Sequence, residues 1–169
     1  MPNRLRSTGG FTFVESLITF SIVGIFLALT WATVNFLLIK TNEQIVKTRA
    51  HFLAVEGIEV TRQIKQTAVN RDREGGFYDS IGSKNGTFVL VKDGDAFSLE
   101  PDNNPEQITM TEEPYTTYCR TITFLEGDER VKQVSAEVRW GDALDCSKGE
   151  DMIAYSTYLA DQTNENPES

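Results

Sequence analysis

An uncharged apolar stretch near the N-terminus constrains the fold of this chain more than any other feature. Its 24 residues run from Ser16 to Ile39 without one charged side chain. About 20 apolar residues are enough for a helix to cross the hydrocarbon core of a bilayer. We therefore expect residues 11–39 to form a transmembrane helix, and the residues that flank it to decide its orientation.

The ten residues before this helix form a basic leader. Residues 1–10 contain Arg4 and Arg6 and no acidic side chain. Positive charge on that side holds an N-terminus in the cytoplasm, so the chain after Ile39 is expected outside the membrane. Glu15 lies just inside the apolar segment. A carboxylate at the centre of such a helix costs roughly 2.5–3.5 kcal/mol on insertion scales, so its presence indicates a function.

The junction between the leader and the apolar segment carries a short motif. Its sequence is Gly10-Phe11-Thr12-Phe13-Val14-Glu15-Ser16-Leu17. It resembles the leader junction of type IV pilins and type II secretion pseudopilins, in which a membrane peptidase cuts after the glycine and the new N-terminal residue is N-methylated. The resemblance implies that the chain is cut between Gly10 and Phe11, that Phe11 is N-methylated, and that Glu15 becomes the fifth mature residue.

Cleavage at this junction supplies a partner for the carboxylate. The new ammonium of Phe11 would lie about 6 Å from Glu15 along one helix axis, at a rise of 1.5 Å per residue. We expect the two groups to pair between neighbouring subunits, where pairing would neutralise both charges and fix the axial stagger. Phe11 and Glu15 are therefore the predicted assembly residues. The alternative is an uncleaved signal anchor that carries an extracytoplasmic binding domain and never polymerises.

An amphipathic pattern follows in residues 40–70. Small or apolar residues recur there at spacings of three and four, at Val46, Ala50, Leu53, Gly57, Val60 and Ile64. This spacing places them on one face of a helix. Since no proline interrupts residues 11–70, a single helix of about 60 residues and ~90 Å is expected. Its amphipathic half, 40–70, is predicted to pack on a globular domain.

The block from residue 51 to 64 is similar to a recurrent segment in the long helix of bacterial pilin-like proteins. It reads His-Phe-Leu-Ala-Val-Glu-Gly-Ile-Glu-Val-Thr-Arg-Gln-Ile. We interpret Gly57 as the position at which the sheet approaches the helix, and we expect Glu56 and Arg62 near the polar rim. His51 has no metal-binding partner at a suitable spacing and is interpreted as a partly exposed helix residue.

Residues 71–161 are predicted to form an extracytoplasmic β-sheet domain. A loop over 70–86, anchored by Phe77 and Tyr78, leads into it. The predicted strands are 87–91, 96–99, 118–125, 132–140 and 152–159. The alternation of apolar and polar residues in the last three of these strands favours an antiparallel meander with one face on the helix. The fold class is therefore α+β, a long helix packed on a small antiparallel sheet, as in type IV pilins.

Two further segments are expected to lack regular structure. Residues 101–114 are interpreted as a long polar connection that contains three prolines. Loops of this length often have binding or contact functions. Residues 162–169 read as a polar, disordered tail.

The chain has two cysteines, Cys119 and Cys146. An even number of cysteines in an extracytoplasmic domain favours a disulfide between them. The enclosed loop of about 27 residues would stabilise the fold by roughly 3–4 kcal/mol on a chain-entropy argument. Two buried free thiols are the alternative.

Composition narrows the classes of function. The net charge is −9, and loss of Arg4 and Arg6 with the leader would bring it to about −11. Such a surface argues against nonspecific binding to nucleic acid. The chain has one histidine and lacks a phosphate loop or a Ser-His-Asp set, so no enzyme activity and no cofactor are expected.

No metal site is expected either. Several oxygen-bearing side chains follow the predicted strand 87–91, at Asp93, Asp95, Asp102, Asn103 and Asn104. Their spacing matches no defined calcium loop such as an EF-hand. We interpret them as turn-forming residues.

The resemblance thus implies a structural subunit of a type IV pilus or pseudopilus that serves motility, adhesion, DNA uptake or secretion. The implied partners are other pilin subunits, the prepilin peptidase and N-methyltransferase, the inner-membrane assembly platform, and the lipid bilayer before assembly. The implied location is the inner membrane, with a cytoplasmic N-terminus, followed by an extracellular filament or a periplasmic pseudopilus.

Overall fold

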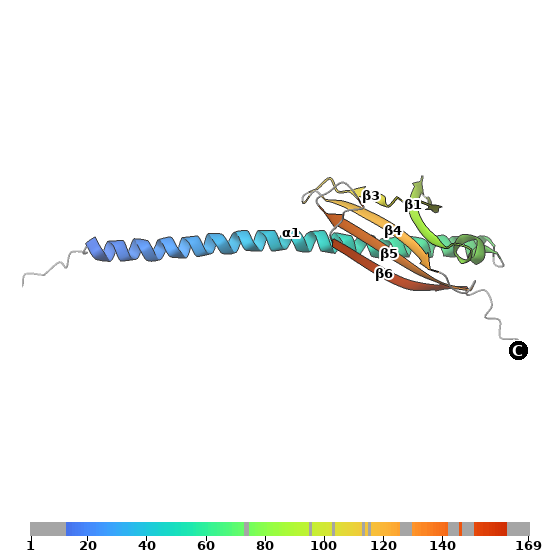
Figure 1. The fold of residues 1–169 in the computed structure, drawn as a ribbon, viewed down its shortest axis with the longest axis horizontal. Coiled ribbons are helices and arrows are strands. Elements are labelled where there is room, and N and C mark those ends of the chain that lie inside the picture. Colours follow the sequence, from blue (N-terminus) through green and yellow to red (C-terminus); the bar gives the residue numbers. More distant parts are fainter. Residues whose placement is uncertain are drawn as a thin grey trace, which may run out of the picture. The chain divides into compact units, whose positions relative to one another are not determined.

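The computed structural model describes residues 13–72, 75–94, 96–102, 104–112, 114, 116–125, 130–141, 146 and 151–161. The fold is α+β, with a long N-terminal helix packed on a six-stranded antiparallel sheet (Figure 1). Helix α1 spans Phe13–Arg71 and a π-helical turn, η1, spans Tyr78–Gly82. The strands are β1 (Gly86–Asp93), β2 (Ala96–Pro101), β3 (Glu106–Thr109), β4 (Thr117–Leu125), β5 (Val131–Gly141) and β6 (Asp151–Ala160).

The chain divides into two compact units, residues 1–43 and 44–169. Within the second unit the strand order is β2-β1-β4-β5-β6, and β3 pairs with β4. Each neighbouring pair is antiparallel. The last three long strands therefore form the predicted meander, β4-β5-β6.

The inner face of this sheet forms the core together with the second half of α1. The predicted helix stripe is confirmed, because Ala50, Gly57 and Val60 are buried. Val46, Leu53 and Ile64 are partly buried and pack against the core. The sheet contributes Ile122, Phe124, Val134, Ala136 and Val138, which are almost completely buried. Period-2 patterning thus identified the inward positions of β4 and β5 correctly.

Two sequence-based expectations for the connections were wrong. The segment 101–114 contains β3, which pairs with β4 from Glu106 opposite Arg120 to Thr109 opposite Thr117. With Ile108 as its one large apolar residue, β3 is too short to show an alternating pattern. In the loop 70–86 Phe77 is buried at 3% exposure, as expected of an anchor, but Tyr78 is 48% exposed. The predicted tail, 162–169, lies outside the described residues.

Gly57 allows α1 to approach the sheet, as predicted. A Cβ atom at this position would lie 2.9 Å from Cδ1 of Ile122, 3.3 Å from Cδ of Arg120 and 3.4 Å from Cβ of Ala136. The first of these distances is shorter than a normal carbon contact. A side chain at residue 57 would therefore push α1 away from β4 and β5.

Gly57→Val is expected to lower the free energy of unfolding of the second unit by about 2 kcal/mol, because overpacking a core contact costs about 1–3 kcal/mol. Urea unfolding of the full chain in detergent micelles, followed by circular dichroism, measures this change. Gln66→Val, at an exposed position of the same helix, is the matched control and should change stability by less than about 0.5 kcal/mol. Equal losses in the two variants would contradict a close contact at Gly57.

Candidate membrane and assembly site

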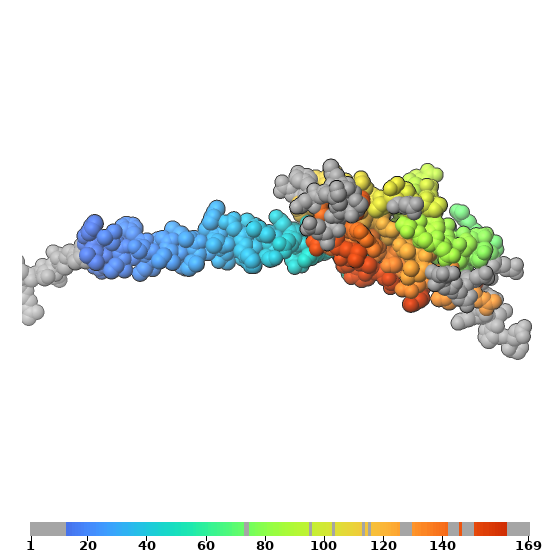
Figure 2. Space-filling view, in the orientation of Figure 1, coloured from blue at the N-terminus to red at the C-terminus, as the bar shows by residue number. Residues whose placement is uncertain are grey.

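The first unit presents apolar side chains around the whole surface of its helix. Large apolar residues from Phe13 to Ile39 are exposed, with Phe13 at 78% and Trp31 at 71%. Figure 2 shows this segment in blue, with its own side chains forming its surface. Soluble proteins rarely expose a continuous apolar patch of more than a few hundred Å². The surface therefore requires lipid or another protein to cover it.

The polar side chains from Thr19 to Asn35 are bonded to the helix itself. The hydroxyls of Thr19, Ser21, Thr30 and Thr33 each donate to the backbone carbonyl four residues earlier, at 2.8 Å. The side-chain amide of Asn35 donates in the same way to the carbonyl of Trp31, at 3.1 Å. Such bonds satisfy polar groups without water. The segment can therefore enter an apolar environment without stranding these donors.

Among the described residues, α1 is the one helix that is long and apolar enough to cross a membrane. Glu15 lies in its first turn and is exposed. A negative charge in that turn is stabilised by the helix dipole, and no other side chain from Phe13 to Ile39 is charged. The two other predicted junction residues, Gly10 and Phe11, lie outside the described residues.

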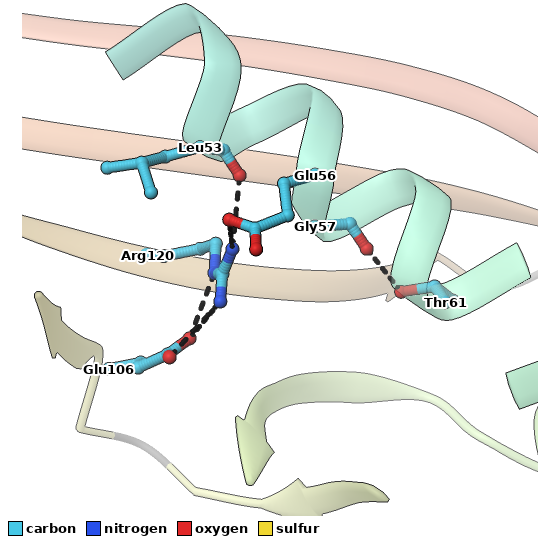
Figure 3. A network of polar contacts seen from close by, with 6 residues as sticks. All are labelled: Leu53, Glu56, Gly57, Thr61, Glu106 and Arg120. Carbon is cyan, nitrogen blue, oxygen red and sulfur yellow. Dashed lines mark hydrogen bonds and ion pairs between the residues drawn. The ribbon is translucent and has the colours of Figure 1, made fainter. Parts of the chain in front are cut away.

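In the second unit a buried arginine joins α1 to two strands (Figure 3). Arg120 lies on the inner face of β4 at 3% exposure. Its Nε and Nη2 donate to the carboxylate of Glu106 on β3, at 2.9 and 3.1 Å. Its Nη1 donates to the carbonyl of Leu53 at 3.2 Å and to the carboxylate of Glu56 at 3.0 Å. A two-pronged arginine–carboxylate contact of this kind is strong and directional.

The helix backbone around this arginine is satisfied as well. Thr61 donates its hydroxyl to the carbonyl of Gly57 at 2.8 Å (Figure 3). Because Gly57 has no side chain, the aliphatic part of Arg120 can lie against the helix. A buried guanidinium is tolerated only when its charge and its N–H groups find partners, and here α1 and β3 supply them. The network fixes β3 and β4 to the helix.

A second polar contact fixes α1 nearer the start of the second unit. The buried hydroxyl of Tyr118 donates to the carbonyl of Val46, at 3.2 Å. Burial raises the pKa of Tyr118, while the positive charge of Arg49 and a hydrogen bond with Thr116 act in the opposite direction. The phenol therefore stays protonated at neutral pH and remains a donor.

The predicted disulfide between Cys119 and Cys146 is present, with the two Cα atoms 5.5 Å apart. Both cysteines are buried. Cys119 alternates along β4 with Tyr118 and Arg120, which face α1, so it lies on the opposite face of the sheet. The bond ties the connection between β5 and β6 to the central strand β4.

No protein-family model, no curated protein and no solved structure matches this chain. Its function must therefore be inferred from its own residues. Two features are available: an apolar first half of α1, residues 13–39, whose single charge lies in the first turn, and a sheet that polar contacts fix to the second half of that helix.

Three further interpretations from the sequence agree with the structure, whereas Asp95 and Asn103, also interpreted as turn-forming, lie outside the described residues. Glu56 is half exposed, and Arg62 is exposed and pairs with Glu59 at 2.8 Å, so both lie near the polar rim. His51 is half-buried, and its Nδ1 is hydrogen-bonded to the hydroxyl of Tyr155. Asp102 acts in a turn, since its carboxylate accepts from the backbone N–H of Asn104 at 2.8 Å.

Sequence reasoning missed the roles of Arg120 and Glu106. The sequence did contain a signal for the role of Arg120. This residue occupies an inward position in the same alternating series as Ile122 and Phe124. A charged residue in an apolar position of a strand indicates a buried ion pair. The acidic partner Glu106 could not be found in the same way, because β3 itself was not predicted.

Proposed function

We propose that this chain is a pilin-like structural subunit, held in a membrane by α1 and then packed into a type IV pilus or pseudopilus through the same helix. One observation carries the proposal. Glu15 is the single charged side chain from Phe13 to Ile39, in a helix whose polar side chains from Thr19 to Asn35 are bonded internally. A simple membrane anchor does not need such a charge, whereas an assembling helix can use it to set its register.

The proposed sequence of events follows from this charge. A prepilin peptidase removes residues 1–10, and Phe11 becomes an N-methylated terminus on the cytoplasmic side of the inner membrane. The ammonium of Phe11 then pairs with Glu15 of a neighbouring subunit as the assembly platform extracts the helix from lipid. The exposed apolar surface serves in both environments, because it faces lipid before assembly and other helices afterwards.

The second unit supplies the surface that the filament would display. The contacts of Arg120 and Tyr118 with α1 hold its sheet to the helix, and the disulfide at Cys119 ties the connection between β5 and β6 to β4. A rigid attachment of this kind transmits the position of the helix to the displayed surface. We assign the chain no catalytic role.

Mass spectrometry of the chain produced together with a prepilin peptidase tests this proposal. The mature protein is expected to begin at N-methylated Phe11 and to lack residues 1–10. A Gly10→Val variant, in which a bulky residue replaces the predicted glycine, should keep its leader. If the unaltered chain also retains residues 1–10, the proposal fails in favour of a membrane-anchored binding domain.

A further inference from the structure

Strand β6 lies at one edge of the sheet that the described residues form. In the part of the chain that the structure describes, it pairs only with β5, through ten residue pairs from Trp140 opposite Asp151 to Val131 opposite Ala160. Figure 1 shows it along the outer margin of the sheet. A free strand edge presents a row of N–H and C=O groups to which another extended segment can bind.

The residues of β6 lack the features that usually prevent another strand from pairing with an edge strand. Edge strands are usually protected by charged side chains, by proline, by bulges or by being short. In β6 the nine residues from Met152 to Ala160 carry no charge and no proline. The opposite edge of the sheet differs, because β2 has six residues and ends in Glu100 and Pro101.

The side chains of β6 indicate what could bind there. On the face turned away from α1, Met152 is 56% and Tyr158 is 68% exposed, and the residues between them on that face, Ala154 and Ser156, are small. An added strand could therefore lie flat beside β6. It would contact Met152 near one end of β6 and Tyr158 near the other. Methionine and tyrosine favour apolar and aromatic neighbours.

Charge further restricts the partner. The chain carries a net charge of −9, which repels acidic segments. Exposed Asp151 begins β6, and the nine residues that follow it are neutral. A segment with an uncharged centre and a basic residue beside Asp151 would complement this edge.

We propose that β6 binds an extended segment of another protein as a seventh strand, antiparallel to β6. The segment has an uncharged centre and a basic residue near the end that lies beside Asp151. The main-chain groups of β6 provide the binding energy, and Met152, Tyr158 and Asp151 select the segment. This contact is separate from assembly through α1, and it holds whether or not the chain polymerises.

A capped peptide based on residues 131–141 provides the probe, with the substitutions Lys132→Thr, Glu137→Thr, Arg139→Thr and Trp140→Arg. The parent sequence is that of β5, which already pairs antiparallel with β6 and places residue 140 opposite Asp151. The substituted peptide therefore has an uncharged centre and a basic residue beside Asp151. It is added, with a fluorescent label, to the full chain in detergent micelles. We expect saturable binding and slower hydrogen exchange at alternate backbone amides of residues 152–160.

Two versions of the peptide make the test specific for strand addition. One is N-methylated at the odd-numbered residues and the other at the even-numbered residues. Only one set of alternate N–H groups can face β6, so one version should lose binding and the other should keep it. Ala154→Lys, at an exposed position of β6, should weaken binding at least tenfold. Ser98→Lys, at an exposed position of the opposite edge strand, should leave it unchanged.

Several results would overturn the proposal. These are absence of binding, equal binding by both N-methylated peptides, or slowed exchange in residues 13–39 in place of β6. The N-methylated peptides use the unaltered chain, so they decide the question even if Ala154→Lys does not fold.

Discussion

Glu15→Val is expected to leave membrane insertion intact and to reduce filament assembly by a hundredfold or more. Insertion should not suffer, because the substitution removes the one charge from the apolar segment. Assembly should suffer, because the ammonium of Phe11 in a neighbouring subunit would be buried without its partner. Leaving one member of a buried pair uncompensated costs about 3–5 kcal/mol, and each 1.4 kcal/mol is a factor of ten. Immunoblots of sheared filaments and of membranes, from cells that carry the assembly machinery, measure both quantities.

Glu43→Val is the matched control for this experiment. It also exchanges a glutamate of α1 for valine, but Glu43 forms an exposed ion pair with Lys40, at 2.7 Å. Exposed pairs of this kind contribute about 0–1 kcal/mol, so assembly should change by no more than a few-fold. Normal amounts of filament from Glu15→Val, or an equal loss from Glu43→Val, would contradict the proposal that the charge of Glu15 sets the register between neighbouring subunits.

Much of the fold could be predicted because its signals are local. The proline-free run and the spacing of Ala50, Gly57 and Val60 predicted α1 and its packed face, and alternation predicted β4, β5 and β6. In each case the residues that form the predictive pattern are close together in the chain. They lie within one or two turns of a helix or within a few positions of a strand. The disulfide followed from the number of cysteines and the expected compartment.

The missed features depend on residues far apart in the chain. Strand β3 exists because Glu106 and Ile108 lie opposite Arg120 and Tyr118 on β4, a pairing that four residues of sequence do not reveal. The contact of Arg120 with Glu56 joins residues 64 positions apart. The partner proposed for Glu15 is more remote still, because it belongs to another subunit, and only the resemblance of the junction motif indicates it.

Arg120→Ala is expected to lower the free energy of unfolding of the second unit by about 3 kcal/mol. The substitution removes a buried guanidinium that bonds to Glu106, to Glu56 and to the carbonyl of Leu53. It leaves the half-buried carboxylate of Glu106 without its partner and opens a cavity beneath α1. Urea unfolding of the full chain in micelles measures the loss. Hydrogen exchange should also quicken at residues 106–109, because β3 loses its link to the helix.

Companion variants separate the charge effect from packing. Arg139→Ala removes an exposed arginine that pairs with Glu137 and should cost less than about 1 kcal/mol. Arg120→Met fills most of the space but leaves the carboxylate of Glu106 uncompensated, so it should recover only part of the stability. Adding Glu106→Gln to Arg120→Met removes that charge and should bring stability to within about 1 kcal/mol of the unaltered chain. Full recovery by Arg120→Met alone would mean that Arg120 acts by filling space, and that the ion pair does not hold β3 to α1.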